Sequence, residues 1–159
     1  MLPMIRRHRS GGMDRTENDM LALDVAAWLA SCSFAVMKRK MSILLVEDDA
    51  ALGPLTLRAL IQLGHRSELA ASASSAYAHL SNPHAFNLIL LDLQLGDESS
   101  EPLILRLRQE GFEIPNIVIF SALPVNQLLR VARTIGASDL LQKPASIDDL
   151  YQAIERAAA

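Results

Sequence analysis

Cysteine and long charge-free hydrophobic runs are both scarce in this sequence. Cys32 is the only cysteine among 159 residues, so the chain has no internal disulfide framework, which fits a reducing compartment and a cytoplasmic location. The most apolar segment of the N-terminal region is free of charged residues only over 25–36, whereas a membrane-spanning helix needs about 20 apolar residues. We therefore do not expect a membrane-bound protein.

Positive charge is scarce after residue 40. Residues 1–40 contain seven Lys or Arg and four Asp or Glu, whereas residues 41–159 contain eight and fourteen. Because an acidic domain repels the phosphate backbone of nucleic acids, we expect no direct nucleic-acid binding by residues 41–159. The hydrophobic content of 50% is sufficient for one domain with a normal core.

Residues 1–40 form an N-terminal extension with a composition of its own. Residues 1–19 are polar and basic without helical or strand periodicity, and we expect them to be disordered. The following segment, MLALDVAAWLASCSFAV (20–36), is apolar except for Asp24 and a few small polar residues, and the basic run KRK (38–40) separates it from Met41. Three interpretations remain open: an upstream extension that is not part of the natural product, a short apolar helix that packs on the domain or on a partner, or a membrane or export signal, against which Asp24 counts.

Apolar runs of strand length alternate with segments of helical period from Met41 onward. The continuous run SILLV (42–46) is typical of a strand that is covered on both faces. The predicted strands are 42–46, 65–70, 86–92, 116–120 and 138–142. The predicted helices are 51–63, 72–80, 99–109, 125–135 and a last helix that opens at Ser146, its expected N-cap. Five β/α repeats predict an α/β fold with a doubly wound parallel sheet.

Polar side chains follow four of the five predicted strands. They are Glu47 and Asp48 after the first strand, Asp92 after the third, Ser121 after the fourth and Lys143 after the fifth. With the strand order 2-1-3-4-5, the carboxylates of Glu47, Asp48 and Asp92 converge at the carboxyl ends of the strands. Their mutual repulsion requires a positive partner, and a site of carboxylates with open water positions suits Mg²⁺. Lys143 and Ser121 complete a cradle for a phosphoryl group, with Asp92 as the nucleophile that becomes an aspartyl phosphate.

Residues 41–159 resemble a response-regulator receiver domain of two-component signalling. The motifs that carry the resemblance are LLVEDDA, LILLDLQLGD, IVIFSA and LLQKP, in this order along the chain. The resemblance implies the flavodoxin-like (βα)₅ fold with strand order 2-1-3-4-5. It also implies that Glu47 and Asp48 form an acidic pair, with Asp48 as the direct Mg²⁺ ligand, and that Asp92 is the phosphoacceptor for a phosphohistidine donor.

The resemblance assigns roles to further positions. The backbone carbonyl of Gln94 is implied as a metal ligand, and Ser121 and Lys143 as contacts of the phosphoryl oxygens. A cis peptide bond is implied between Lys143 and Pro144, which X-Pro sequences adopt at low cost. Leu140 occupies the position of the family's aromatic switch residue, so readout through the fourth helix, fifth strand and fifth helix is expected to be muted or to rely on leucine packing.

The implied protein is a phosphorylated signalling domain and not an enzyme in the usual sense. Its implied phosphodonor is a histidine kinase or a histidine phosphotransfer protein. We expect a stand-alone receiver, in which phosphorylation switches a surface for an unidentified downstream protein, and a homodimer is left open. Two alternatives are kept: a receiver module of a phosphorelay, and a receiver-like interaction scaffold with atypical readout at Leu140. A haloacid-dehalogenase-like phosphohydrolase is disfavoured because it requires an aspartate where Gln94 stands.

Three further features of the domain are less informative. The loop after Gln94 reads GDESS (96–100), where the family often has a proline two residues after the metal-binding carbonyl, so its conformation is left open. Asp49, the last acid of the EDD triplet, is predicted to start the helix over 51–63 rather than to join the site. The histidines after residue 41 lack metal-ligand spacing and are predicted to be surface or hydrogen-bonded residues: His65, His79 and His84.

Overall fold

The computed structural model describes residues 39–82, 85–96 and 98–159. The fold below is that of the compact unit Met37–Ala159. The expectations of a disordered tail and a short apolar helix in residues 1–38 lie outside the described residues. Within the described part of the chain, no helix is long and apolar enough to cross a membrane.

The centre of the domain is a five-stranded parallel sheet in the order β2-β1-β3-β6-β7. Its strands are β1 (Ser42–Val46), β2 (Arg66–Ala70), β3 (Leu88–Leu91), β6 (Asn116–Ser121) and β7 (Asp139–Gln142). If these five strands are counted one to five along the chain, their order in the sheet is 2-1-3-4-5. The predicted strand order is therefore confirmed. Strand β1 pairs in register with both of its neighbours, so that Val46 lies opposite Ala70 on one side and Leu91 on the other.

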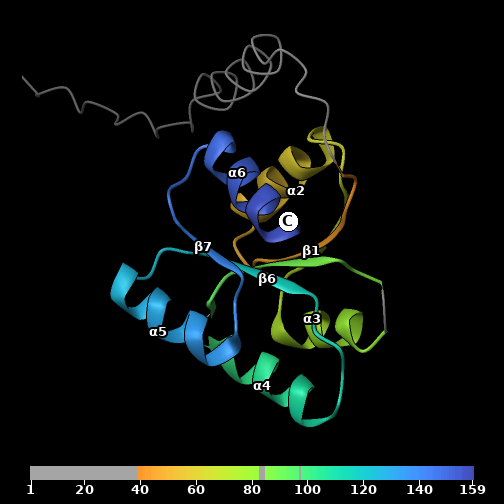
Figure 1. Cartoon of the computed structure of the whole chain (residues 1–159), viewed down its shortest axis with the longest axis vertical. Coiled ribbons are helices and arrows are strands. Elements are labelled where there is room, and N and C mark those ends of the chain that lie inside the picture. The colour runs from red at the N-terminus through yellow and green to blue at the C-terminus, as the bar shows by residue number, and fades with distance from the viewer. Residues whose placement is uncertain (1–38, 83–84, 97) are drawn as a thin grey trace, which may run out of the picture. The chain divides into compact units, whose positions relative to one another are not determined.

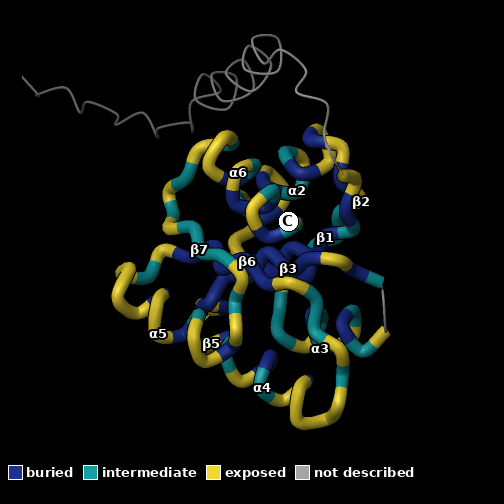
Figure 2. The backbone as a smooth tube through the Cα atoms, viewed as in Figure 1, coloured by how far each residue is buried: buried dark blue, intermediate teal, exposed yellow. Residues whose placement is uncertain are grey.

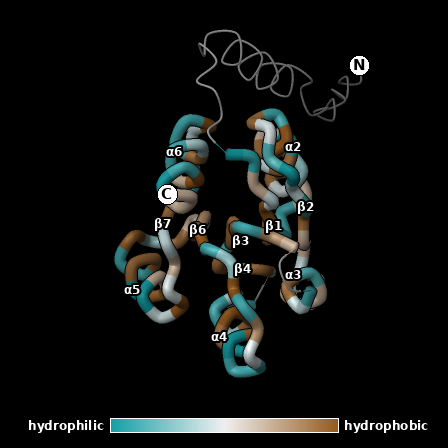
Figure 3. Tube along the Cα trace, turned by 45° about the vertical axis from the view of Figure 1, so that its right-hand side comes forward, coloured by the Kyte–Doolittle hydropathy of each residue, from teal (hydrophilic) through white to brown (hydrophobic). Residues whose placement is uncertain are grey.

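Five helices cover the two faces of this sheet. The helices are α2 (Leu52–Gln62), α3 (Ala73–Leu80), α4 (Glu101–Gln109), α5 (Val125–Ile135) and α6 (Ile147–Ala158). Figure 1 shows α2 and α6 on one face, and α3, α4 and α5 on the other. Hydrophobic and hydrophilic residues alternate along these helices, as expected of elements that bury one side against a sheet (Figure 3).

The core consists of one hydrophobic cluster on each face of the sheet. Alternate residues of β1 supply the two clusters: Leu44 and Val46 belong to the cluster under α3, α4 and α5, and Ile43 and Leu45 to the cluster under α2 and α6. These four side chains are at most 1% exposed, and the central strands are buried apart from the first residues of β1 and β6, such as Asn116 (Figure 2). Burial on both faces explains why the strand is a continuous apolar run, since each such side chain contributes about 1.5–3 kcal/mol.

A short antiparallel hairpin after β3 was not predicted. Strand β4 (Gln94–Leu95) pairs with β5 (Glu98–Ser99), with Leu95 opposite Glu98. The backbone N–H of Ser100 then donates to the carbonyl of Leu93 at 3.1 Å. Because residues 98 and 99 are held in this hairpin, α4 begins at Glu101 and not at 99 as the periodicity predicted.

Candidate functional site

Three carboxylates meet at the carboxyl end of the central strands. Glu47 and Asp48 directly follow β1, and Asp92 directly follows the neighbouring strand β3. One ligand oxygen from each of the three carboxylates can be chosen so that all lie within 4.8 Å of one another. Glu47 is 2% and Asp92 8% exposed, whereas Asp48 is exposed to solvent. The structure therefore brings together the acidic residues that the sequence placed at one edge of the sheet.

Lys143 bridges two of these carboxylates. It follows β7, and its backbone N–H donates to the carbonyl of Ser121 at 2.9 Å. Its ammonium group donates to Glu47 Oε2 at 2.5 Å and to Asp92 Oδ2 at 2.6 Å, and lies 5.0 Å from the centre of the Phe120 ring. The peptide bond between Lys143 and Pro144 is cis. Lys143 therefore balances part of the negative charge of Glu47 and Asp92, and its ammonium group lies against the carboxylate oxygens of Asp92.

The charges of this cluster do not cancel. Burial raises the pKa of the Glu47 carboxyl, against the opposing effect of the nearby Lys143 ammonium. Burial also lowers the pKa of Lys143, but its hydrogen bonds and charge interactions with Asp92 and Glu47 outweigh this effect, so the net pKa is raised and the lysine is a cation at neutral pH. One lysine against three carboxylates leaves an excess of negative charge that a divalent cation can balance. All three residues offer oxygen, the donor that Mg²⁺ prefers.

The hairpin after β3 contacts both Asp48 and Asp92. The N–H of Gly96 donates to Asp48 Oδ2 at 2.7 Å, and the N–H of Gln94 donates to Asp92 Oδ1 at 3.1 Å. The fully buried hydroxyl of Ser100 donates to the backbone carbonyl of Asp92 at 2.6 Å. Sequence reasoning placed Gln94 at the site through its carbonyl but missed the contacts of Gly96 and Ser100. The sequence feature that could have pointed to these contacts is the departure of the 96–100 loop from the family pattern.

Ser121 supplies a buried hydroxyl at the end of the neighbouring strand. It ends β6 and lies opposite Gln142 of β7, one residue before Lys143. Ser121 is 0% exposed, and its Oγ has no hydrogen-bond partner among the described residues. A buried polar atom without a partner costs about 1–3 kcal/mol, so this hydroxyl is an available donor or acceptor. Leu140, on the same strand β7, is half-buried and packs against the cluster under α3, α4 and α5.

The side chain of Asp49 does not join the carboxylate cluster, although its backbone N–H donates to Glu47 Oε1 at 3.3 Å. Its Oδ1 accepts the backbone N–H groups of Leu52 and Ala51, both at 2.8 Å. These hydrogen bonds lower the pKa of the Asp49 carboxyl below its ordinary value. The prediction that Asp49 starts the first helix of the domain, and not the site, is confirmed.

The prediction for His65 is wrong. The residue is 4% exposed, and neither ring nitrogen has a hydrogen-bond partner among the described residues. Burial lowers its pKa, with a smaller opposing effect from the charge of Glu155. His79, in contrast, is partly exposed and lies 3.5 Å from a carboxylate oxygen of Glu68. His84 lies outside the described residues.

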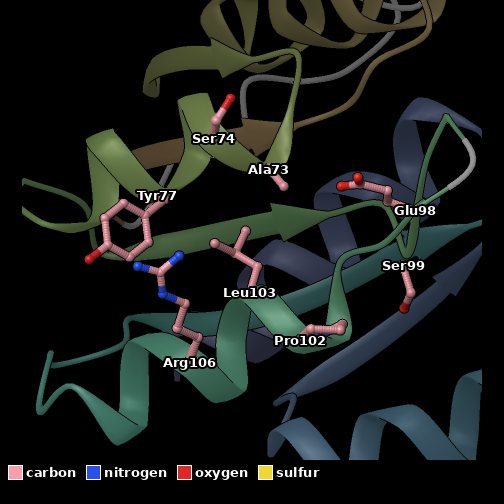
Figure 4. A pocket seen from close by; sticks show the side chains of 8 residues that line it. All are labelled: Ala73, Ser74, Tyr77, Glu98, Ser99, Pro102, Leu103 and Arg106. Carbon is pink, nitrogen blue, oxygen red and sulfur yellow. The ribbon is translucent and has the colours of Figure 1, made fainter.

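A groove between α3 and α4 is lined in part by polar residues (Figure 4). It has a volume of about 600 Å³. Across it, the guanidinium of Arg106 lies 4.6 Å from the centre of the Tyr77 ring, and the Tyr77 hydroxyl donates to Glu110 at 2.6 Å. None of the predicted site residues lines this groove. Tyr77 and Arg106 both pair with Glu110, outside the groove lining.

Comparison with known proteins supports one family. The family model of the response regulator receiver domain matches residues 43–155. The chain is 35% identical over 114 residues to the transcriptional regulatory protein CrdR of Helicobacter pylori, which covers 72% of this chain and 53% of CrdR. It is 30% identical over 126 residues to the photosynthetic apparatus regulatory protein RegA of Rhodobacter capsulatus, which covers 79% of this chain and 67% of RegA. The chain spans about half the length of the first curated relatives it matches.

Solved structures show the same fold. The non-phosphorylated HemR receiver domain of Leptospira biflexa is 30% identical and superposes with a TM-score of 0.65, covering 76% of this chain and 95% of that domain. A CheY-like response regulator receiver domain of Methanospirillum hungatei is 26% identical with a TM-score of 0.65, covering 74% of this chain and 92% of that one. The predicted flavodoxin-like fold is confirmed.

Proposed function

The chain belongs to the response regulator receiver domain family, and we propose that Asp92 accepts a phosphoryl group from a phosphohistidine. The donor is a histidine kinase or a histidine phosphotransfer protein. One observation carries this proposal: Asp92 directly follows the central strand β3, where it meets two further carboxylates and the ammonium group of Lys143. Receiver domains take part in phosphorelay signalling and are not enzymes in the usual sense, and the catalysis proposed here is limited to the domain's own phosphorylation and dephosphorylation.

The residues present fit a Mg²⁺ site. Glu47, Asp48 and Asp92 supply hard oxygen ligands that lie close together, and we assign the metal to them together with the backbone carbonyl of Gln94. Asp48, the exposed member of the cluster, is the direct ligand that is open to water. When bound, the cation balances the negative charge of the carboxylates and of the incoming phosphoryl oxygens.

The side chains of this domain carry out the transfer. A carboxylate oxygen of Asp92 attacks the phosphorus, the P–O bond forms as the P–N bond to the donor histidine breaks, and the leaving imidazole nitrogen takes up a proton. Lys143 already donates to Asp92 Oδ2, so it needs only a small movement to donate to a phosphoryl oxygen. The Ser121 hydroxyl, which has no partner in the part of the chain that the structure describes, supplies a second contact.

Output follows from the movement of these two residues. Ser121 is the last residue of β6 and Lys143 directly follows the neighbouring strand β7. The shift of the two side chains toward the phosphoryl group changes the populations of two pre-existing states of a protein-interaction surface. Leu140 stands at the switch position where the family has an aromatic ring, so the conformational change is transmitted by the packing of this leucine. The second candidate function is a receiver-like interaction scaffold with this atypical readout. CrdR is named as a transcriptional regulatory protein, but the acidic domain described here passes its signal to a downstream protein and not to DNA.

Labelling with a small phosphodonor tests the proposal. Incubation with acetyl phosphate and Mg²⁺ should add one phosphoryl group to the wild-type chain and none to Asp92→Asn, as measured by intact-protein mass spectrometry. The matched control is Asp49→Asn, which changes the neighbouring acid that caps α2 and should leave labelling intact. Chelation of Mg²⁺ should abolish labelling. Label that persists in Asp92→Asn would refute the assignment.

A further inference from the structure

We propose that Gly96 is a positioning residue for the metal site, because its backbone N–H orients the Asp48 carboxylate. The inference rests on the Mg²⁺ site proposed above. The family often has a proline at this place in the loop, and a proline has no N–H to donate. In this chain the N–H of Gly96 donates to Asp48 Oδ2 at 2.7 Å. The glycine therefore makes a contact that a proline could not make.

The conformation of Gly96 requires a glycine or a residue that tolerates the left-handed region. Its φ is +62°, a value that side chains with a Cβ adopt only with strain. A Cβ built at Gly96 would come no closer than 3.9 Å to Asp48 Oδ2, so space is available. The pairing of Leu95 with Glu98 holds the start and the end of this turn. The constraint at residue 96 is therefore its backbone dihedral and its N–H, and not the volume of a side chain.

Asp48 is the one acid of the cluster that Lys143 does not fix. Lys143 donates to Glu47 and to Asp92, whereas the hydrogen bond recorded for Asp48 within the described part of the chain comes from Gly96. Asp48 is also the exposed member of the three. Without a partner, an exposed aspartate samples several rotamers, and a metal site then loses affinity because the ligand must be ordered on binding.

The hydrogen bond to Asp48 leaves room for a cation. A carboxylate has about four lone-pair positions, so one N–H on Oδ2 leaves Oδ1 free to bind metal. Carboxylates that bind metals are commonly hydrogen-bonded in turn, and loss of such a supporting contact typically lowers metal affinity by about 10–100-fold. The other contacts of the hairpin, from Gln94 and Ser100, act on Asp92. The effect of Gly96 is therefore specific to Asp48.

Magnesium affinity of residue-96 variants tests the inference. Isothermal titration of the full chain with MgCl₂ should show that Gly96→Pro binds Mg²⁺ on the order of tenfold more weakly than wild type. Gly96→Asn keeps the N–H and tolerates the left-handed region, so it should bind within about threefold of wild type, given that its supporting contact is retained. Gly111→Asn is the matched control, because Gly111 also has a positive φ, +83°, and a Cβ there would meet nothing within 4 Å. Equal affinity of Gly96→Pro and wild type would overturn the inference, as would equal losses in the proline and asparagine variants.

A double-mutant cycle separates the N–H from a general change in the loop. In an Asp48→Ala background, Gly96→Pro should cause no further loss of Mg²⁺ affinity, because the carboxylate that it positions is gone. A second measurement does not depend on metal: the amide proton resonance of Gly96 should shift in Asp48→Ala, and that of Gly111 should not. A tenfold loss that persists in the Asp48→Ala background would show that the loop acts through Asp92 instead, and would overturn the inference.

The same experiment distinguishes the inference from the proposed function. If wild type shows no Mg²⁺ binding, or if Asp48→Ala binds it as tightly as wild type, the metal site itself is wrong. If wild type binds, Asp48→Ala binds weakly and Gly96→Pro equals wild type, only the positioning role of Gly96 is lost.

Discussion

The three consecutive acids after β1 have different partners. Glu47 accepts from Lys143, and Asp48 accepts from the backbone of Gly96. Asp49 accepts from the first N–H groups of α2, where the helix dipole favours a negative charge. Three like charges in sequence are therefore tolerated in part because each carboxylate accepts hydrogen bonds from a different group.

At His65 the protein buries a titratable group that has no hydrogen-bond partner within 39–82, 85–96 and 98–159. Its pKa is lowered by burial, so the folded state holds it neutral while the unfolded chain titrates near the ordinary value of about 6.5. For a depressed pKa, the stabilisation is complete above about pH 6.5 and is lost as pH falls through the folded-state pKa. Acidification from pH 7 should therefore reduce the free energy of unfolding.

We predict that His65→Leu flattens this acid dependence. The substitution removes the titrating group and two polar atoms without partners, so the variant should lose less stability than wild type between pH 7 and pH 5. Each unit of depressed pKa corresponds to about 1.4 kcal/mol of this difference. Urea unfolding across this pH range measures it. Parallel slopes for His65→Leu and wild type would contradict the prediction.

Among the elements, α6 has the best-defined start. Ser146 Oγ accepts the N–H of Asp149 at 3.1 Å, and Asp149 Oδ2 accepts the N–H of Ser146 at 3.0 Å, which completes a capping box. The sequence predicted this N-cap, and the prediction is confirmed. The cap matters to the site because α6 packs against β6 and β7, the strands that carry Ser121 and Lys143.

We predict that Ser146→Ala destabilises the domain by about 1 kcal/mol, because the N–H of Asp149 in the first turn loses its side-chain acceptor. Thermal or urea unfolding of the variant measures the loss. Gln152→Ala, at an exposed position of the same helix, is the control and should change stability by less than about 0.5 kcal/mol. Equal effects of the two substitutions would show that the capping box contributes nothing.

Long elements were predictable from the sequence, and the contacts that depend on tertiary structure were not. The helix over 125–135 was predicted to the residue, because its periodicity is clear and Gly136 ends it in the left-handed region. The β4–β5 hairpin was missed because two-residue strands have no periodicity. The contact of the Gly96 N–H was missed because its acceptor, Asp48, is 48 residues away in the sequence. The burial of His65 was missed for a similar reason, because the residues that cover this side chain belong to elements that are separate in the sequence.

At the scale of the whole molecule, the site exists only when the sheet is complete. Lys143 and Glu47 are 96 residues apart, and Lys143 and Asp92 are 51 apart, so the unfolded chain does not hold these groups together. The parallel sheet brings them to one edge because the carboxyl ends of its strands coincide. A ligand of this site therefore binds the folded state and not the unfolded one.

We predict that Mg²⁺ raises the stability of the domain through the carboxylate cluster. A ligand that binds only the folded state adds about 2.7 kcal/mol at 100 times its dissociation constant, and the melting temperature of wild type should rise with MgCl₂ accordingly. Asp48→Asn should lose most of this rise, and without metal it should be at least as stable as wild type, because one of three neighbouring like charges is removed. Asp49→Asn keeps the cluster intact and should rise as wild type does, whereas an equal rise in all three proteins would place the Mg²⁺ elsewhere on the molecule.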